Sequence, residues 1–144
     1  MNRRQIIILV DKLAKDNLTF GEYAQRLEKE LECLTLEELK ESLLECGVIP
    51  ESFGHDSSEE KLYSKYTDIL LAKAFNFLGI NARIVKQRAD SADVEGSTKE
   101  YSIVGDAKAF RLSRTAKNQK DFKVEALSKW RKDKDFACLI CPLY

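Results

Sequence analysis

The first half of the chain has hydrophobic residues at helical spacing, and the runs are preceded by helix-start signals. A Ser or Thr followed three residues later by Glu forms a capping box, in which each side chain satisfies a free backbone amide of the first helical turn. These pairs are Thr19 with Glu22, Thr35 with Glu38, and Ser57 with Glu60. Gly47 and Gly79 are typical helix terminators. The pattern predicts helices over residues 4–15, 20–33, 36–46 and 58–78.

Beyond Gly79 the pattern changes to short apolar runs separated by polar breaks, which is typical of strands. The predicted strands cover residues 81–87, 93–96 and 100–110. A helix is expected at 120–133, and the continuous apolar run DFACLICPLY predicts a last strand inside a mixed or parallel sheet. The order from residue 58 is α-β-β-β-α-β. We therefore expect an α/β (α+β) fold with a mixed sheet.

The stretch GVIPESFGHDSS, residues 47–58, separates the acidic, helical first third of the chain from the rest. Pro50, Gly54 and the paired serines interrupt regular structure, so we expect a linker here. The predicted organisation is an N-terminal helical subdomain, residues 1–56, followed by a core of residues 57–144. A chain of 144 residues with 44% hydrophobic content is large enough for about one compact unit.

Charge is divided unevenly along the chain although the formal net charge is zero. Residues 1–60 carry 14 acidic and 7 basic side chains, whereas residues 61–144 carry 10 and 17. A basic C-terminal half favours an anionic partner.

The apolar run after Arg3 and Arg4 is too short for a signal peptide or a membrane span. We expect a cytoplasmic protein without membrane contact.

An acid-x-lysine triplet occurs four times, at residues 38–40, 59–61, 106–108 and 121–123. Only Asp106 and Lys108 fall on a predicted strand, where residues two apart point to the same face. In the predicted helices such residues point about 200° apart. Asp93 begins the preceding strand, so a hairpin would bring its carboxylate beside that of Asp106. Two clustered carboxylates need a cation, and hard oxygen ligands favour Mg²⁺.

Asp93, Asp106 and Lys108 together predict a site for phosphodiester hydrolysis. Mg²⁺ held by Asp93 and Asp106 would activate water, and Lys108 would orient that water or stabilise the developing negative charge. Asp68 precedes an apolar run on the long predicted helix, and we place it in the same site, while Glu60 has the capping role. The alternative is an exposed ion pair between Asp106 and Lys108, worth well under about 1 kcal/mol.

A basic residue recurs every third position from 108 to 123. The residues are Lys108, Arg111, Arg114, Lys117, Lys120 and Lys123. A period of three drifts by about 60° per step on a helix, so one straight helix cannot align them. A bent basic segment interleaved with Ser, Thr, Asn and Gln suits a nucleic-acid backbone and base edges. A purely solvated surface is the alternative.

Three stretches of sequence resemble the HindIII-type type II restriction endonucleases, members of the PD-(D/E)xK nuclease superfamily. They are EKLYSKYTDILLAKAFNFLGIN, QRADSADV and DAKAFRLSRTAKNQKDFKVEALSKWRKDKDFA, within residues 58–142. The resemblance implies a restriction-endonuclease-like core with Asp93 and Asp106 as the acids of the motif and Lys108 as its lysine. Ala92 replaces the proline that names the motif. Asp68 occupies a helix position where the superfamily often has Glu.

The resemblance also implies the partners of this chain. The expected partner is double-stranded DNA with a recognition site like AAGCTT. Asn118 and Lys120 are expected to read bases. The expected backbone contacts are Arg111, Arg114 and Lys117. A homodimer and a cognate DNA methyltransferase are also implied. Because this family has longer chains, we expect a protein that lacks the C-terminal half. A truncated, non-catalytic DNA-binding remnant is therefore the alternative function, and a nuclease for branched DNA is a third.

Overall fold

A computed structural model describes residues 1–16, 18–85, 91–113 and 124–142. The helices in this part are α1 (Arg3–Lys15), α2 (Phe20–Glu30), α3 (Leu36–Glu45), α4 (Ser58–Phe77) and α5 (Val124–Arg131). The strands are β1 (Asn81–Ile84), β2 (Val94–Ser97), β3 (Ser102–Ala107) and β4 (Phe136–Ile140). The predicted order from residue 58 and the α/β (α+β) fold with a mixed sheet are confirmed.

Side-chain caps define where the N-terminal helices begin. The capping boxes of Thr19 at α2 and Thr35 at α3 are formed as predicted, and Asn2 with Gln5 forms a further one at α1. At α4 the hydroxyl of Ser57 accepts a hydrogen bond from the amide of Glu60. The Glu60 carboxylate does not accept one from the Ser57 amide, so the capping box is incomplete. It accepts from the amide of Asp56 instead, which leaves its other oxygen available to a different partner.

The sheet has the order β1-β2-β3-β4. β1, β2 and β3 form an antiparallel meander, and β4 runs parallel to β3. The prediction that β4 lies inside the sheet is wrong for the described residues, where β4 is an edge strand and Phe136 and Ile140 are exposed. The apolar run indicated parallel pairing correctly, but it could not show that only one neighbour would be present.

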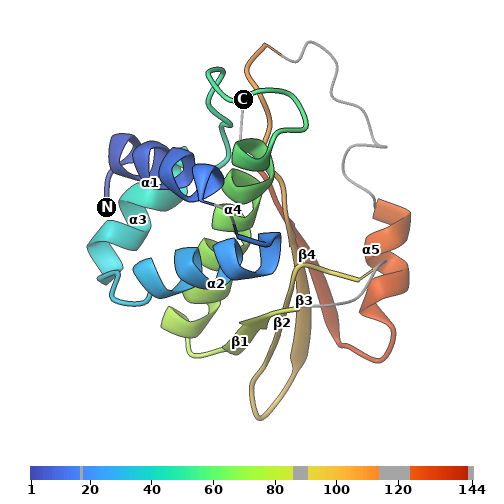
Figure 1. Cartoon of the computed structure of the whole chain (residues 1–144). Coiled ribbons are helices and arrows are strands. Elements are labelled where there is room, and N and C mark those ends of the chain that lie inside the picture. Colours follow the sequence, from blue (N-terminus) through green and yellow to red (C-terminus); the bar gives the residue numbers. More distant parts are fainter. Residues whose placement is uncertain (17, 86–90, 114–123, 143–144) are drawn as a thin grey trace.

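α4 lies between the N-terminal helices and one face of the sheet, and α5 covers the opposite face (Figure 1). The side chains of β3 explain this arrangement. A Cβ atom at Gly105 would lie 3.0 Å from Leu71 of α4, whereas Val104 packs with Leu127 of α5. Since neighbouring strand residues point to opposite faces, Asp106 is on the same face as Val104.

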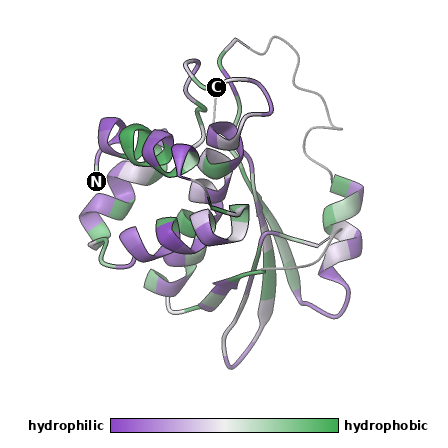
Figure 2. Ribbon diagram, viewed as in Figure 1, coloured by the Kyte–Doolittle hydropathy of each residue, from purple (hydrophilic) through white to green (hydrophobic). Residues whose placement is uncertain are grey.

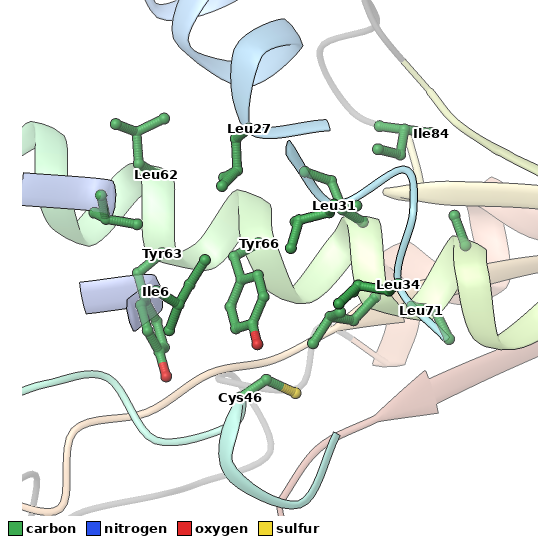
Figure 3. Packing of buried hydrophobic residues seen from close by; sticks show 14 of the residues in the cluster. Ile6, Leu27, Leu31, Leu34, Cys46, Leu62, Tyr63, Tyr66, Leu71 and Ile84 are labelled. Carbon is green, nitrogen blue, oxygen red and sulfur yellow. The ribbon is translucent and has the colours of Figure 1, made fainter. Parts of the chain in front are cut away.

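Buried residues of the N-terminal helices, α4, β1 and β2 form one hydrophobic cluster. In Figure 3, Ile6, Leu27 and Cys46 surround the side chains of Tyr63 and Tyr66 of α4. Figure 2 shows alternating hydrophobic and hydrophilic stretches along α1, as expected for a helix with one buried face. None of the helices in the described residues has the length and apolar character needed to span a membrane.

The predicted linker is bound to the core. Val48 forms a parallel bridge with Phe110, the amide of Ile49 donates to the Phe110 carbonyl at 3.0 Å, and the Phe110 amide donates to Gly47 at 2.8 Å. Phe53 is buried and its ring contacts Tyr63. Residues 47–54 therefore connect α3 to α4 and also hold the chain that follows β3. The division into a subdomain of residues 1–56 and a core of residues 57–144 stays a prediction.

Candidate active site

The antiparallel register of β2 and β3 brings Asp93 beside Asp106. Val94 pairs with Gly105, and the amide of Asp93 donates to the Gly105 carbonyl at 3.1 Å. The two carboxylates therefore occupy the next position of the ladder, and a hydrogen bond between them contributes to the pKa of Asp93. Asp106 is only 2% exposed. The predicted convergence of these two acids is present in the structure.

Lys108 closes onto Asp106 from just beyond the end of β3. Its ammonium lies 2.6 Å from Asp106 Oδ2, and its backbone amide continues the parallel ladder by donating to Ile140 at 2.8 Å. The side chains of Lys108 and Asp106 are 17% and 3% exposed, so the alternative of an exposed surface ion pair is wrong. An ion pair taken out of water loses solvation and needs further compensating contacts.

Asp68 reaches the same region from α4, where it is 7% exposed. The ammonium of Lys65 lies 3.1 Å from its Oδ2 atom, one helical turn away. Lys65 was not predicted from the sequence to belong to the site. The Lys-x-x-Asp spacing on a helix was the available signal, since residues three apart are neighbours on a helix surface.

Burial and neighbouring charges make full ionisation of this cluster unfavourable. Burial, followed by the charge of Asp68 and the hydrogen bond and charge of Asp106, raises the pKa of Asp93 from 3.8 to about 7. Burial also raises the pKa of Asp68 to about 6, although Lys65 opposes the shift. The three acids lie close enough to repel one another, so either a proton or a cation stabilises the group.

The residues present fit a divalent cation. Oδ2 of Asp106 is buried and accepts no hydrogen bond from the described residues, because Lys108 approaches it outside hydrogen-bond alignment. A buried carboxylate oxygen without a hydrogen-bond partner, beside a second carboxyl, suits the all-oxygen coordination of Mg²⁺. Asp68, Asp93 and Asp106 do not place three ligand atoms within 4.8 Å of one another. Among the described residues, only His55, Asp56 and Glu60 do so, and His55 and Asp56 are exposed.

A hollow of about 490 Å³ adjoins the site along α4. Asp68 and Lys65 line one part of it, and Glu60 lines another. Since these residues lie on one helix, the hollow runs along the outer surface of α4.

Arg111, predicted to contact the DNA backbone, is engaged with Glu60 at 3.0 Å in the structure. We call this ion pair, together with the contacts of Arg111 and Ser113 to Gly54 and Glu51, the Arg111 network. Contact between Arg111 and DNA stays a prediction. The other predicted DNA contacts lie outside the described residues; they are Arg114, Lys117, Asn118 and Lys120.

Comparison with known proteins shows to which family the chain belongs. The model of the HindIII restriction endonuclease family matches residues 4–144. The chain belongs to this family. It is 47% identical over 134 residues to the type II restriction enzyme HindIII of Haemophilus influenzae, a match that covers 90% of this chain and 45% of the relative. This HindIII-family chain therefore spans less than half the length of that relative.

Proposed function

We propose that this protein is a type II restriction endonuclease that hydrolyses phosphodiester bonds of double-stranded DNA with Mg²⁺. The observation that carries the proposal is the convergence of Asp93, Asp106 and Lys108 at a buried position in a chain of the HindIII family. A structural ion pair between Asp106 and Lys108 would not require the half-buried carboxyl of Asp93 beside it.

The proposed roles follow from the position and charge of each group. Asp93 and Asp106 hold Mg²⁺, which when bound makes a water molecule acidic and offsets charge on the phosphate. Lys108 keeps its ammonium at Asp106, where it can orient the attacking water and stabilise negative charge that develops on the scissile phosphate. Asp68 adds a negative charge from α4 and accepts from Lys65.

The proposed DNA contacts come from the basic segment that follows Ser113. Arg114 and Lys117 would neutralise backbone phosphates, and Asn118 and Lys120 would read base edges, with a site like AAGCTT. Support comes from the spacing of the basic residues and from family membership.

Because a palindrome is cut on both strands by a two-fold assembly, we also propose a homodimer. A cognate methyltransferase and a cytoplasmic location complete the proposal.

The test is digestion of a plasmid that contains AAGCTT, with Mg²⁺ or with EDTA, followed by mapping of the product ends. We expect Mg²⁺-dependent cleavage by the wild type and a loss of at least about 100-fold in Asp106→Asn, because that change removes a metal ligand. A gel shift is expected to remain. Cleavage at an unchanged rate in Asp106→Asn would refute the assignment. A salt-sensitive gel shift without any cleavage by the wild type would favour the non-catalytic DNA-binding remnant.

A further inference from the structure

The chain that leaves the candidate active site is held by the stretch between α3 and α4. Lys108 is followed within two residues by Phe110, which exchanges backbone hydrogen bonds with Gly47 and Ile49 at 2.8 and 3.0 Å. Backbone hydrogen bonds on both sides of one residue restrict its position. The exit from β3 is therefore ordered by contacts with residues that are about 60 positions earlier in the sequence.

Arg111 extends this attachment to the first turn of α4. Its Nε atom donates to Glu60 Oε1 at 3.0 Å, and its Nη2 atom donates to the carbonyl of Gly54, also at 3.0 Å. The side chains of Arg111 and Glu60 are 14% and 17% exposed. Although burial acts to raise the pKa of Glu60, the hydrogen bonds from Arg111 and from the Asp56 amide hold it below its usual range. The pair is thus charged and largely removed from solvent.

Glu51 binds Ser113, two residues further along the chain. Its carboxylate accepts from the amide of Ser113 at 3.0 Å and from the Ser113 hydroxyl at 2.8 Å, and it lies 3.9 Å from Arg111. Ser113 is the last described residue before position 114. The point from which the predicted DNA-binding segment continues is therefore set by Glu51.

These contacts leave Arg111 poorly suited to hold a DNA phosphate. To reach a phosphate, its guanidinium would have to leave Glu60 and the Gly54 carbonyl, and the part-buried carboxylate of Glu60 would then lack its partner. The described surroundings of Arg111, namely Glu60, Glu51 and the Gly54 carbonyl, explain its charge without DNA.

We propose that Arg111, Glu60 and Glu51 are positioning residues that join the strand carrying Asp106 and Lys108 to the helix carrying Asp68. Glu60 and Asp68 lie on α4 and line the same hollow, so the Arg111 network ties both parts of the site together. The network also holds Ser113, the last described residue before position 114. This inference rests on the proposed nuclease function, because it assigns these residues to the rate of that reaction rather than to DNA affinity.

The experiment compares Arg111→Lys, Arg111→Gln and Glu60→Gln, together with the double variant Arg111→Gln/Glu60→Gln, in two assays. The first is single-turnover cleavage at saturating protein, and the second is the salt dependence of DNA binding. Arg111→Lys is the decisive variant, since lysine can hold a phosphate but cannot donate to Glu60 and Gly54 in the same forked geometry. Arg83→Gln, which breaks an exposed ion pair with Glu95 on β1 and β2, is the matched control.

We expect each single variant of the network to lose about 10- to 100-fold in cleavage rate, since small displacements of catalytic groups cost that much. The double variant should lose no more than the worse single one, because both changes remove the same interaction. DNA affinity should change less than about 3-fold, with an unaltered salt slope. Arg83→Gln should cleave like the wild type.

Two results would overturn the inference while leaving the nuclease proposal intact. In the first, the wild type cleaves and Glu60→Gln cleaves equally fast. In the second, Arg111→Lys behaves as the wild type while Arg111→Gln lowers the salt slope by about one phosphate contact, a change of about 0.9 in the slope. If the wild type does not cleave at all, the proposed function fails, and the inference that depends on it fails as well.

Discussion

At the scale of single residues, the candidate site is defined by an excess of negative charge. Asp68, Asp93 and Asp106 influence one another electrostatically, and among the described residues only Lys65 and Lys108 form ion pairs with them. Burial together with this excess keeps a proton on the cluster near neutral pH, as the pKa of about 7 for Asp93 indicates. The free energy of unfolding of the metal-free protein must therefore depend on pH.

Replacing Asp93 with Asn should stabilise the metal-free protein at high pH. The pKa of its carboxyl is about 7 in the folded chain, compared with the ordinary 3.8. Between these values the folded protein retains a proton that the unfolded chain has lost, so wild-type stability decreases as pH rises through this window. We expect Asp93→Asn to exceed the wild type by about 1–2 kcal/mol near pH 8 and to match it near pH 4.

Urea unfolding in EDTA at several pH values measures this difference directly. Asp11→Asn, which removes an exposed carboxylate from α1, is the control for a general change of net charge. If Asp93→Asn were no more stable than the wild type near pH 8, the buried carboxyl would not carry the expected energetic cost.

Mg²⁺ should stabilise the folded chain through the same acids, whether or not the protein cleaves DNA. A ligand present at ten times its Kd adds about 1.4 kcal/mol to the free energy of unfolding. We expect Mg²⁺ to raise the Tm of the wild type, with a larger shift near pH 8 than near pH 6, because metal ligands must be deprotonated. Asp106→Asn should show little shift. A thermal-melt series with Mg²⁺ and EDTA tests this, and an equal shift in Asp106→Asn would remove Asp106 as a ligand.

The sequence was sufficient to predict that Asp93, Asp106 and Lys108 lie close together, because strand periodicity and hairpin register are local rules. Asp68 was placed by its unusual position before an apolar run. The partners of Arg111 could not be predicted, since Glu51 and Glu60 lie more than 50 positions away in sequence and meet it only through the fold. A basic residue in a basic run does not indicate by its sequence position that it forms an ion pair with a carboxylate of the same chain.

At the scale of elements, β3 is tightly packed at Gly105, because α4 and β4 both approach it closely. A Cβ atom at Gly105 would lie 3.0 Å from Leu71, and 3.3 Å from both Cys138 and Phe75. Glycine therefore allows the helix and the neighbouring strand to approach the residue that precedes Asp106. Any displacement of β3 at this point also displaces the candidate site.

Gly105→Val should consequently destabilise the fold by about 1–3 kcal/mol, the usual cost of inserting methyl groups into a packed core. Gly21→Val is the matched control, because no atom lies within 4 Å of a Cβ at this position of α2. The control should be neutral or slightly stabilising, since Gly is the poorer helix former. Urea unfolding of both variants gives the comparison. Equal stabilities would show that the contacts around Gly105 relax without cost.

The boundaries of the elements were predictable where a local chemical signal marks them. The capping boxes at Thr19 and Thr35 defined helix starts correctly, and Gly79, with a φ of 82°, ends α4. The strand predicted over residues 100–110 was too long, because β3 covers only Ser102–Ala107 while apolar residues continue to Phe110. The edge position of β4 was not predictable, since the number of neighbouring strands is a property of the whole sheet.

At the scale of the whole molecule, α4 is the element on which the other parts assemble. Its residues from Tyr66 to Ala72 are all buried, and it contacts α1, α2 and α3 as well as the sheet. A helix that is buried on most of its circumference needs partners on more than one side. Tyr63 shows this on the N-terminal side, where Arg3 donates to its hydroxyl and Phe53 contacts its ring.

This arrangement predicts that residues 57–144 do not fold without residues 1–56. Removal of the N-terminal helices would expose Leu62, Tyr63 and Tyr66, which are now at most 3% exposed. Burial of one large apolar side chain contributes about 1.5–3 kcal/mol, and three of them match a substantial part of the roughly 5–15 kcal/mol that stabilises a typical domain. Circular dichroism and urea unfolding of the 57–144 fragment test this. We expect one cooperative transition for the full chain and none for the fragment. A cooperative transition of the isolated fragment would instead show that residues 57–144 are an independent folding unit.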